Sequence, residues 1–336
     1  MSDDKILLDH GSGGKIAHRL TAELLLPLFD NPILSDLHDG AILDLDAGRI
    51  AFSTDTFTVT PLFFPGGDIG DLAVNGTVND VAMCGAKPLY ISLALIIEEG
   101  FPRGDLERIL KSVRRAADKA GVIVVTGDTK VVPKGAADGL FINTSGIGLI
   151  PPGLNIASTA ARPGDHILLS GTMADHGMTI LTQREGLGFD HTIQSDSAAL
   201  NRMVAGITAA SRDVHVLRDP TRGGVGTTLN EIAASSGVGI AINEVQLPVR
   251  PEVAAVCELL GFDPLYVANE GKLLAFVPAA DSEKVLAAMQ RDPHGREACM
   301  IGTVTADHPG QVILETRVGG HRIVDMLTGE QLPRIC

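Results

Sequence analysis

Aromatic residues are scarce in this sequence of 336 residues, which contains no Trp and only two Tyr. Proteins that bind single-stranded nucleic acid stack bases on aromatic side chains, so the composition argues against such a surface. The formal net charge of −14 argues the same way, because an acidic protein repels a phosphate backbone. We therefore expect no nucleic-acid partner, although a local site for a nucleotide is compatible with these numbers.

Long apolar runs and closely spaced cysteines are also missing. No segment approaches the length that crosses a membrane, and the opening MSDDKILLDH lacks the pattern of a signal peptide. The cysteines at positions 84, 257, 299 and 336 form no C-x-x-C pair, which argues against a structural zinc site and a disulfide framework. The sequence predicts a cytoplasmic protein with no membrane partner and with reduced thiols.

The length and the order of patterns predict two domains of the α/β (α+β) class. Short apolar runs typical of strands alternate with segments of helical periodicity, most clearly at residues 69–84 and 103–121. Proline and glycine punctuate residues 150–165, where we place the domain boundary. The predicted division is an N-terminal glycine loop and helix (1–40), a first domain (41–155), a second domain (156–325) and a flexible tail (326–336).

Two apolar segments end in similar hydroxyl-rich turns that carry an aspartate. FSTDT contains Asp55, and VTGDT contains Asp128. Carboxylates at strand ends are suited to Mg²⁺, which takes few protein carboxylates together with phosphate oxygens. The alternative is that Asp and Thr only form turns by bonding to their own backbone.

The helix expected at residues 69–84 combines an apolar surface with a polar stripe. Its apolar residues cover most of the circumference, which predicts a largely buried helix. Asp71, Asn75 and Asn79 recur every four residues along one face, and Asp80 lies beside them. Buried polar groups need partners. A metal–nucleotide would supply them, and an internal hydrogen-bond network is the alternative.

Two glycine-rich segments are candidates for contacts with phosphate. HGSGGK contains Gly13, Gly14 and Lys15, but it matches neither the Walker A loop nor the dinucleotide-binding pattern. DPTRGGVG contains Arg222 and Gly223 and precedes a predicted helix, whose free backbone N–H groups suit an anion. An ordinary glycine turn is the alternative reading of the second segment.

Three further residues carry chemistry. Glu270 lies in YVANEGK, at a turn between apolar segments, where a partly buried carboxyl group with a raised pKa is a candidate general base. Lys130 follows the GDT motif and is a candidate for neutralising phosphate charge. Cys336 ends the sequence, where a thiol on a short tether would be a carried nucleophile; a chance position is the alternative.

Taken in order, these segments resemble the hydrogenase maturation factor family HypE. The likeness rests on HGSGGK, FSTDT, NGTVNDVAMCGAKP, VTGDTKVV, DPTRGGV, ANEGK and the final PRIC, and it covers nearly the whole chain. The ND-x-A-M-x-G-A-x-P and GDT motifs are similar to those of a wider ATP-dependent superfamily that includes aminoimidazole ribonucleotide synthetase, selenophosphate synthetase and thiamine-monophosphate kinase. PRIC is the family-specific motif.

The resemblance implies the fold of aminoimidazole ribonucleotide synthetase, with mixed sheets packed with helices. It also implies a homodimer in which the N-terminal domains pair and ATP lies at their interface. In the implied reaction, a HypF-like carbamoyltransferase loads Cys336, and ATP-dependent dehydration turns the S-carboxamide into a thiocyanate. The cyano group then passes, with iron-scaffold maturation proteins like HypC and HypD, to a nickel–iron hydrogenase.

The implied reaction needs a metal-bound nucleotide and a base, and we assign these roles to the candidate residues as hypotheses. Glu270 would remove a proton from nitrogen as phosphate leaves, and Lys130 would lie near the phosphates. The residues expected to hold Mg²⁺ are Asp55, Asp80 and Asp128. The residues expected to bind the nucleotide and its metal are Gly13, Gly14, Lys15, Asp55, Asn75, Asn79, Asp80, Asp128, Arg222 and Gly223.

Two other functions stay open on the sequence alone. One is a related enzyme of the same superfamily that acts on a free small molecule, in which Cys336 is incidental. The other is a non-catalytic thiol carrier in a metallocentre assembly complex, which would show no ATP turnover.

Overall fold

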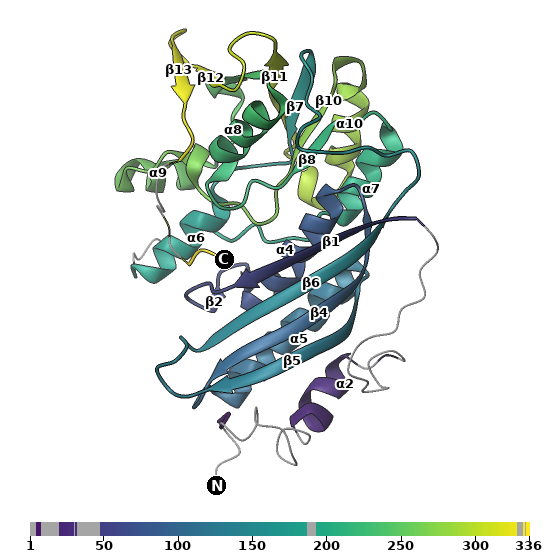
Figure 1. Ribbon diagram of the computed structural model, residues 1–336. Coiled ribbons are helices and arrows are strands. Elements are labelled where there is room, and N and C mark those ends of the chain that lie inside the picture. Colours follow the sequence, from purple (N-terminus) through teal and green to yellow (C-terminus); the bar gives the residue numbers. More distant parts are fainter. Residues whose placement is uncertain are drawn as a thin grey trace.

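The computed structural model describes residues 5–7, 20–29, 31, 48–186, 193–327, 332 and 334–336. Two layered bodies follow one another along the chain, each a sheet packed with helices (Figure 1). The first sheet is built from residues 49–150 and the second from residues 165–324. This arrangement confirms the predicted fold class of mixed sheets packed with helices.

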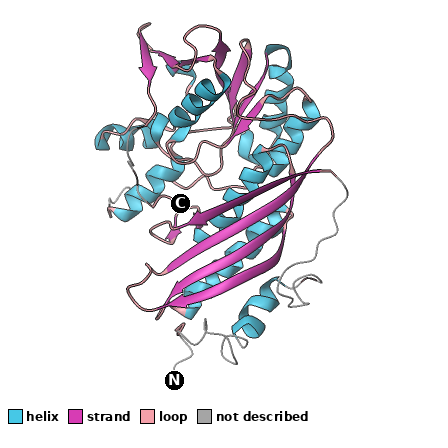
Figure 2. Ribbon diagram, in the orientation of Figure 1, coloured by secondary structure: helices cyan, strands magenta, loops and turns pink. Residues whose placement is uncertain are grey.

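The first sheet has the strand order β1-β6-β4-β5. Its first three strands are antiparallel neighbours, and β4 and β5 run parallel. One face is covered by α4 and α5, as Figure 2 shows. The bounds of these elements are β1 (Arg49–Phe57), α4 (Ile69–Met83), β4 (Lys87–Glu98), α5 (Arg103–Ala120), β5 (Ile123–Val132) and β6 (Leu140–Ile150).

The two helices begin and end where the sequence predicts. Asp68 caps α4, because its side chain accepts from the backbone N–H groups of Gly70 and Asp71 while Asp71 bonds back to the Asp68 N–H. Gly121 ends α5 in the left-handed conformation, with φ of 76°. The helices pack closely, since a Cβ atom at Gly70 would lie 2.5 Å from the carbonyl oxygen of Ile109.

The other face of the first sheet has no layer over it within the part of the chain that the structure describes (Figure 1). Ile50 and Phe52 of β1 are 53% and 64% exposed on this sheet. Ile96 of β4 and Ile123 of β5 are also exposed. A sheet face with large apolar side chains in water is typical of a surface that another subunit covers.

The second sheet has the order β13-β12-β9-β11-β7-β10-β8. Neighbouring strands in this sheet run antiparallel, except for β12 and β9, which run parallel. Its strands are β7 (Asp165–Leu169), β8 (Val216–Arg218), β9 (Gly239–Asn243), β10 (Leu274–Pro278), β11 (Cys299–Thr305), β12 (Val312–Glu315) and β13 (His321–Val324). Its helices are α6 (Asp175–Arg184), α7 (Asn201–Ala210), α8 (Gly224–Ser236), α9 (Pro251–Leu260) and α10 (Ala279–Arg291).

Short elements complete the described chain. Near the N-terminus a π-helical turn, η2, leads into α2, and the hairpin β2–β3 precedes α4. None of the helices in the described ranges is long and apolar enough to span a membrane. The bounds are η2 (Thr21–Leu25), α2 (Leu26–Phe29), β2 (Phe63–Phe64), β3 (Gly67–Asp68), η3 (Glu244–Gln246), η4 (Pro264–Tyr266) and η5 (Pro293–Gly295).

The contact between α4 and α5 yields a prediction about stability. We expect Gly70→Ala to lower the free energy of unfolding by about 1–3 kcal/mol, because the added methyl group must push the helices apart. Gly104→Ala in α5 is the matched control, since a Cβ atom there meets nothing within 4 Å. Urea unfolding of both variants measures the difference, and equal stabilities would contradict the tight contact.

Candidate functional site

Two of the predicted aspartates meet where β1 packs against α4. Asp55 lies on the same face of β1 as Phe57, and both approach Gly76 of α4, where a Cβ atom would lie 2.8 Å from the Phe57 ring. One turn further along α4, Asp80 accepts a hydrogen bond of 2.7 Å from the Ser53 hydroxyl. Burial and the charge of Asp80 raise the pKa of Asp55, and burial raises the pKa of Asp80.

A third carboxyl group joins them from the second domain. Asp219 directly follows β8. Burial and the nearby charge of Asp80 raise the pKa of Asp219 to about 7, and Asp55 also contributes. The described structure therefore concentrates three carboxyl groups at the junction of the two domains, where each makes the ionised form of the others less stable.

The glycine loop that contains Asp219 was only partly anticipated. Arg222, which the sequence singled out, lies close enough for its charge to favour ionisation of Asp55. Gly223 has φ of 79° and precedes the first residue of α8, as expected for a loop that opens a helix. Asp219 itself was missed, although it follows a buried strand as Asp55 and Asp128 were expected to do.

Glu270 is buried beside these carboxyl groups, with only 4% of its surface exposed. Its backbone N–H donates to Asp196 Oδ1 at 3.0 Å. Its own Oε1 has no hydrogen-bond partner among the residues that the structure describes. Burial and the charges of Asp196 and Asp219 raise the pKa of Glu270 well above its usual range. Burial and these charges thus favour the protonated form of Glu270, and a positive charge nearby would favour its ionised form.

The polar stripe of α4 holds two loops of the second domain. Asn75 donates to the Ser197 hydroxyl at 3.0 Å. Asn79 donates to the carbonyl oxygen of Ala198 at 3.0 Å and accepts from the Leu200 N–H at 2.8 Å. Both asparagines therefore take part in the internal hydrogen-bond network that the sequence left open as the alternative to nucleotide contact.

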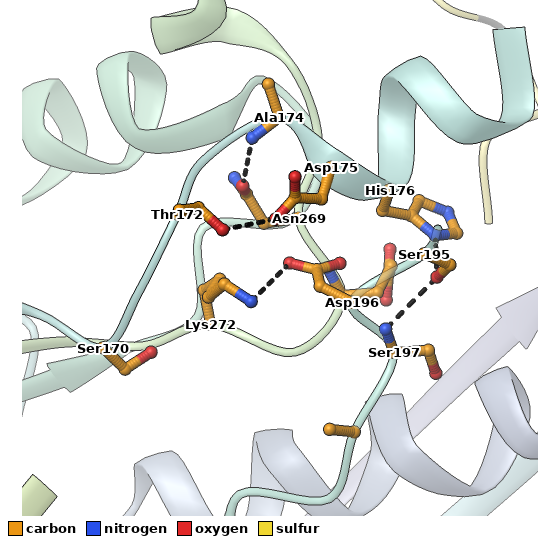
Figure 3. A network of polar contacts seen from close by, with 12 residues as sticks. Ser170, Thr172, Ala174, Asp175, His176, Ser195, Asp196, Ser197, Asn269 and Lys272 are labelled. Carbon is orange, nitrogen blue, oxygen red and sulfur yellow. Dashed lines mark hydrogen bonds and ion pairs between the residues drawn. The ribbon is translucent and has the colours of Figure 1, made fainter. Parts of the chain in front are cut away.

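A network of buried polar side chains surrounds the Glu270 loop (Figure 3). Lys272 Nζ and Asp196 Oδ2 are 3.3 Å apart, and both side chains are at least nine-tenths buried. Asn269 accepts from the Ala174 N–H at 2.8 Å and donates to the carbonyl oxygen of Pro220 at 2.9 Å. Asn269 thus ties the Glu270 loop both to the start of α6 and to the loop that carries Asp219.

The last residues of the sequence are docked against the body. The Thr58 N–H donates to the carbonyl oxygen of Cys336 at 2.9 Å, directly after β1 ends. His176 Nε2 donates to the carbonyl oxygen of Ile335 at 2.7 Å, and Arg184 donates to that of Arg334 at 2.8 Å. Ile335 is buried in the core of the first domain, against which Cys336 also packs. The segment predicted as a flexible tail is thus docked at its end in this structure.

Asp128 and Lys130 do not join the other candidates within one chain. Both are exposed on β5, whereas Asp55 lies on β1 at the opposite edge of the four-stranded sheet. Three strand spacings separate the two edges, which is about 14 Å. The expectation that Asp128 shares one site with Asp55 and Asp80 is therefore corrected for a single chain, because sheet order separates them.

The glycine loop near the N-terminus and the metal are the remaining parts of the predicted site. Gly13, Gly14 and Lys15 lie outside the described residues. Within the described ranges, no three His, Cys, Asp or Glu side chains already form a metal site. The pair Asp55 and Asp80 nevertheless fits Mg²⁺, because this ion takes one or two carboxylates plus phosphate oxygens and would relieve the crowding of negative charge.

Comparison with known proteins supports the predicted superfamily. Residues 37–150 match the family model described as AIR synthase related protein, N-terminal domain, and residues 162–315 match the C-terminal domain of the same description. The chain is 56% identical to a carbamoyl dehydratase HypE of Azotobacter vinelandii over 97% of this chain and 96% of that one. The chain belongs to the carbamoyl dehydratase HypE family.

Solved structures of HypE proteins share the fold. A crystal structure of hydrogenase maturation protein HypE in complex with ATP has a TM-score of 0.95 at 55% identity, covering 98% of this chain and 99% of that one. A chain from a HypE–HypF complex has a TM-score of 0.81 at 49% identity, covering 92% and 99%. The fold and the family that the motifs implied are thereby confirmed.

The raised pKa of Asp219 predicts how stability depends on pH. Because the folded state holds the Asp219 proton up to about pH 7 and the unfolded state releases it near pH 4, wild-type stability falls as pH rises between these values. We expect Asp219→Asn to raise the free energy of unfolding by about 1–3 kcal/mol at pH 8 and by little at pH 4.

Urea unfolding at the two pH values measures this difference, with the exposed Asp307→Asn as the control for removing a surface carboxylate. A gain from Asp219→Asn that is as large at pH 4 as at pH 8 would show that crowding of charge is not its cause.

Proposed function

We propose that this chain uses ATP to dehydrate an S-carbamoyl group on its own Cys336 to a thiocyanate, which supplies the cyanide ligand for maturation of a nickel–iron hydrogenase. The observation that carries the proposal is the docking of Cys336 at Thr58, three positions beyond Asp55 along the same segment. The names of the HypE relatives support the reaction, and the HypE structure with ATP supports the nucleotide.

The proposed dehydration proceeds in two balanced steps. The oxygen of Cys–S–CO–NH₂ attacks the γ-phosphorus of ATP, ADP leaves, and the nitrogen gives up one proton, so that an O-phosphorylated imidate forms. Loss of the second nitrogen proton, with cleavage of the carbon–oxygen bond, gives Cys–S–C≡N and inorganic phosphate. An amide oxygen is a poor leaving group and a phosphate is a good one, which is why the dehydration needs ATP.

Residues at the domain junction supply positioning and proton transfer. Phosphoryl transfer depends mainly on positioning and charge neutralisation. Bound Mg²⁺, held by Asp55 and Asp80 with phosphate oxygens, would supply that neutralising charge, and Arg222 lies near Asp55. Glu270 is the candidate base for the nitrogen proton. Burial raises its pKa, and a raised pKa makes the ionised carboxylate a stronger base for that proton.

A homodimer would complete this site. The exposed apolar face of the first sheet, with Phe52 and Ile96, supplies the surface for pairing. Lys130 is aligned with Ile96 in the sheet, so Lys130 and Asp128 lie along the same edge of that surface. We propose that the partner subunit's Asp128 and Lys130 reach the nucleotide bound at Asp55 and Asp80, which would explain why one chain leaves them apart.

Partners are needed before and after the dehydration. The relative solved as a HypE–HypF complex supports a HypF-like carbamoyltransferase as the protein that loads Cys336. HypC-like and HypD-like iron scaffolds are proposed as acceptors of the cyano group. Both exchanges require the end of the chain to leave its docked position, because Ile335 is buried against the first domain.

The decisive measurement is the intact mass of the protein after incubation with its carbamoyltransferase, carbamoyl phosphate and Mg-ATP. We expect wild type to gain one carbamoyl group and then lose one water. Cys336→Ala should show neither change, whereas Cys299→Ala, which removes a partly exposed thiol of β11 in the second domain, should behave as wild type. Glu270→Gln should gain the carbamoyl group and keep it, because the base is absent.

The outcomes separate the candidate functions. Gain of the carbamoyl group without loss of water in wild type would indicate a non-catalytic carrier. An unmodified Cys336 beside an active carbamoyltransferase would indicate an enzyme that acts on a free small molecule.

A composite site predicts complementation between two inactive variants. Asp80→Asn and Asp128→Asn homodimers should each lose dehydration. A heterodimer of the two, purified through two affinity tags, keeps one site with both aspartates and should recover about half of the wild-type rate. If both residues serve the same site from the same chain, the heterodimer has no intact site and stays inactive.

A further inference from the structure

A cleft of about 670 Å³ opens at the junction of the domains, beyond the Asn75 end of the polar stripe. Its walls come from α5, the β2–β3 hairpin and the start of α4 in the first domain. The second domain contributes the segment at Ser197–Ala199, the start of α7 and η5. This volume is in the range of ligand-binding sites, and apart from Asn75, which was expected to contact the nucleotide, neither the proposed reaction nor the docked Cys336 uses these walls.

The cleft is lined by basic side chains without acidic partners. Arg108, Arg115 and Lys119 follow one face of α5, and Arg202 faces them from α7. All four are exposed, and none forms an ion pair with any residue that the structure describes. In a protein whose net charge is −14, such a concentration of unpaired positive charge marks a surface for a negative ligand.

Other basic residues of the same helix show the contrast. Lys111 lies 2.6 Å from Glu107 and Arg114 lies 2.9 Å from Asp118, each as a pair one turn apart. These pairs lie outside the cleft. Lys111 and Arg114 of α5 are thus paired with acidic residues, whereas the basic residues of α5 that line the cleft are not.

The acidic residues in the cleft wall are occupied locally. Asp68 caps α4 and also accepts from the Ser112 hydroxyl. Asp71 accepts from the Asp68 N–H at 2.9 Å, and burial raises its pKa to about 7. Asp292 accepts from the His294 N–H at 2.9 Å. Hydrogen bonds from neutral donors hold these three carboxyl groups at the wall, where none forms an ion pair with the four basic side chains of the cleft, which outnumber them.

Two of the arginines are held in place before any ligand arrives. The Arg108 guanidinium lies 4.0 Å from the centroid of the Phe63 ring. Arg115 donates to the Ser112 hydroxyl at 2.6 Å, and Ser112 in turn bonds to Asp68. Side chains that are already oriented lose less conformational entropy on binding.

The shape of the basic surface indicates the class of ligand. Arg108 and Arg115 are about 10 Å apart along α5, and Lys119 is about 6 Å further. A second hollow of about 470 Å³ adjoins the cleft, shares Arg202 with it and adds Arg291. Alternate side chains of an extended peptide are about 7 Å apart. An extended peptide can therefore contact several basic side chains in the row, whereas a single phosphate cannot.

We propose that this cleft docks an extended acidic segment of a partner protein. Carboxylates on alternate residues of that segment would pair with Arg108, Arg115 and Lys119, while Arg202 would hold it from the second domain. The docking surface touches both domains and is independent of the reaction proposed above.

Fluorescence anisotropy with a labelled oligoglutamate peptide tests the proposal. Wild type should bind the peptide in spite of its own negative charge, and binding should weaken with added salt. Arg108→Gln/Arg115→Gln should bind roughly tenfold more weakly. Lys111→Gln/Arg114→Gln removes the same charge from the same helix outside the cleft and should bind within about twofold of wild type.

Several results would overturn the proposal. These are absence of peptide binding to wild type, equal loss in the two double variants, and displacement of the peptide by equimolar inorganic phosphate, which would indicate a small-anion site. Thermal melting verifies that both variants are folded, and both should retain the dehydration reaction at the wild-type rate.

Discussion

The side-chain amide of Asn79 joins the two domains at the point where the candidate site forms. It accepts from the Leu200 N–H and donates to the carbonyl oxygens of Ala198 and Glu270, so one buried side chain of α4 holds two loops of the second domain. A buried amide that satisfies three backbone groups is costly to replace, because each group would lose its partner away from water. The distance between Glu270 and the carboxylates of β1 and α4 depends on this contact.

The candidate site brings together carboxyl groups whose negative charges repel one another. The charges of Asp55, Asp80 and Asp219 disfavour one another's ionised forms, and they raise the pKa of Glu270 together with its burial. Lys272 is a buried cation in the neighbouring network and pairs with Asp196. A protein that only needed stability would replace such a cluster with apolar side chains. Carboxyl groups with perturbed pKa values cluster typically at functional sites, which supports a role for this cluster in binding or catalysis.

Local patterns in the sequence predicted where helices and strands begin and end. They predicted less well which distant residues lie close together in the fold. The bounds of α4, α5 and β6 follow from caps, glycine stops and apolar periodicity, all of which act within a few residues. The separation of Asp128 from Asp55 depends on the order β1-β6-β4-β5, which no local pattern encodes. The position of Asp219 after a strand resembles that of Asp55, but the glycines that follow Asp219 predict only a phosphate-binding loop.

The contacts of the docked chain end explain how one position can serve several chemical states. Thr58, His176 and Arg184 donate to the carbonyl oxygens of Cys336, Ile335 and Arg334, which are main-chain atoms. These bonds do not depend on the group that the sulfur carries. A thiol, a thiocarbamate and a thiocyanate can therefore dock in the same register, with Ile335 as the apolar anchor. The side chain of Arg334 also donates to the carbonyl oxygen of Thr58 and forms an ion pair with Asp138, so undocking for exchange with a partner must break these contacts as well.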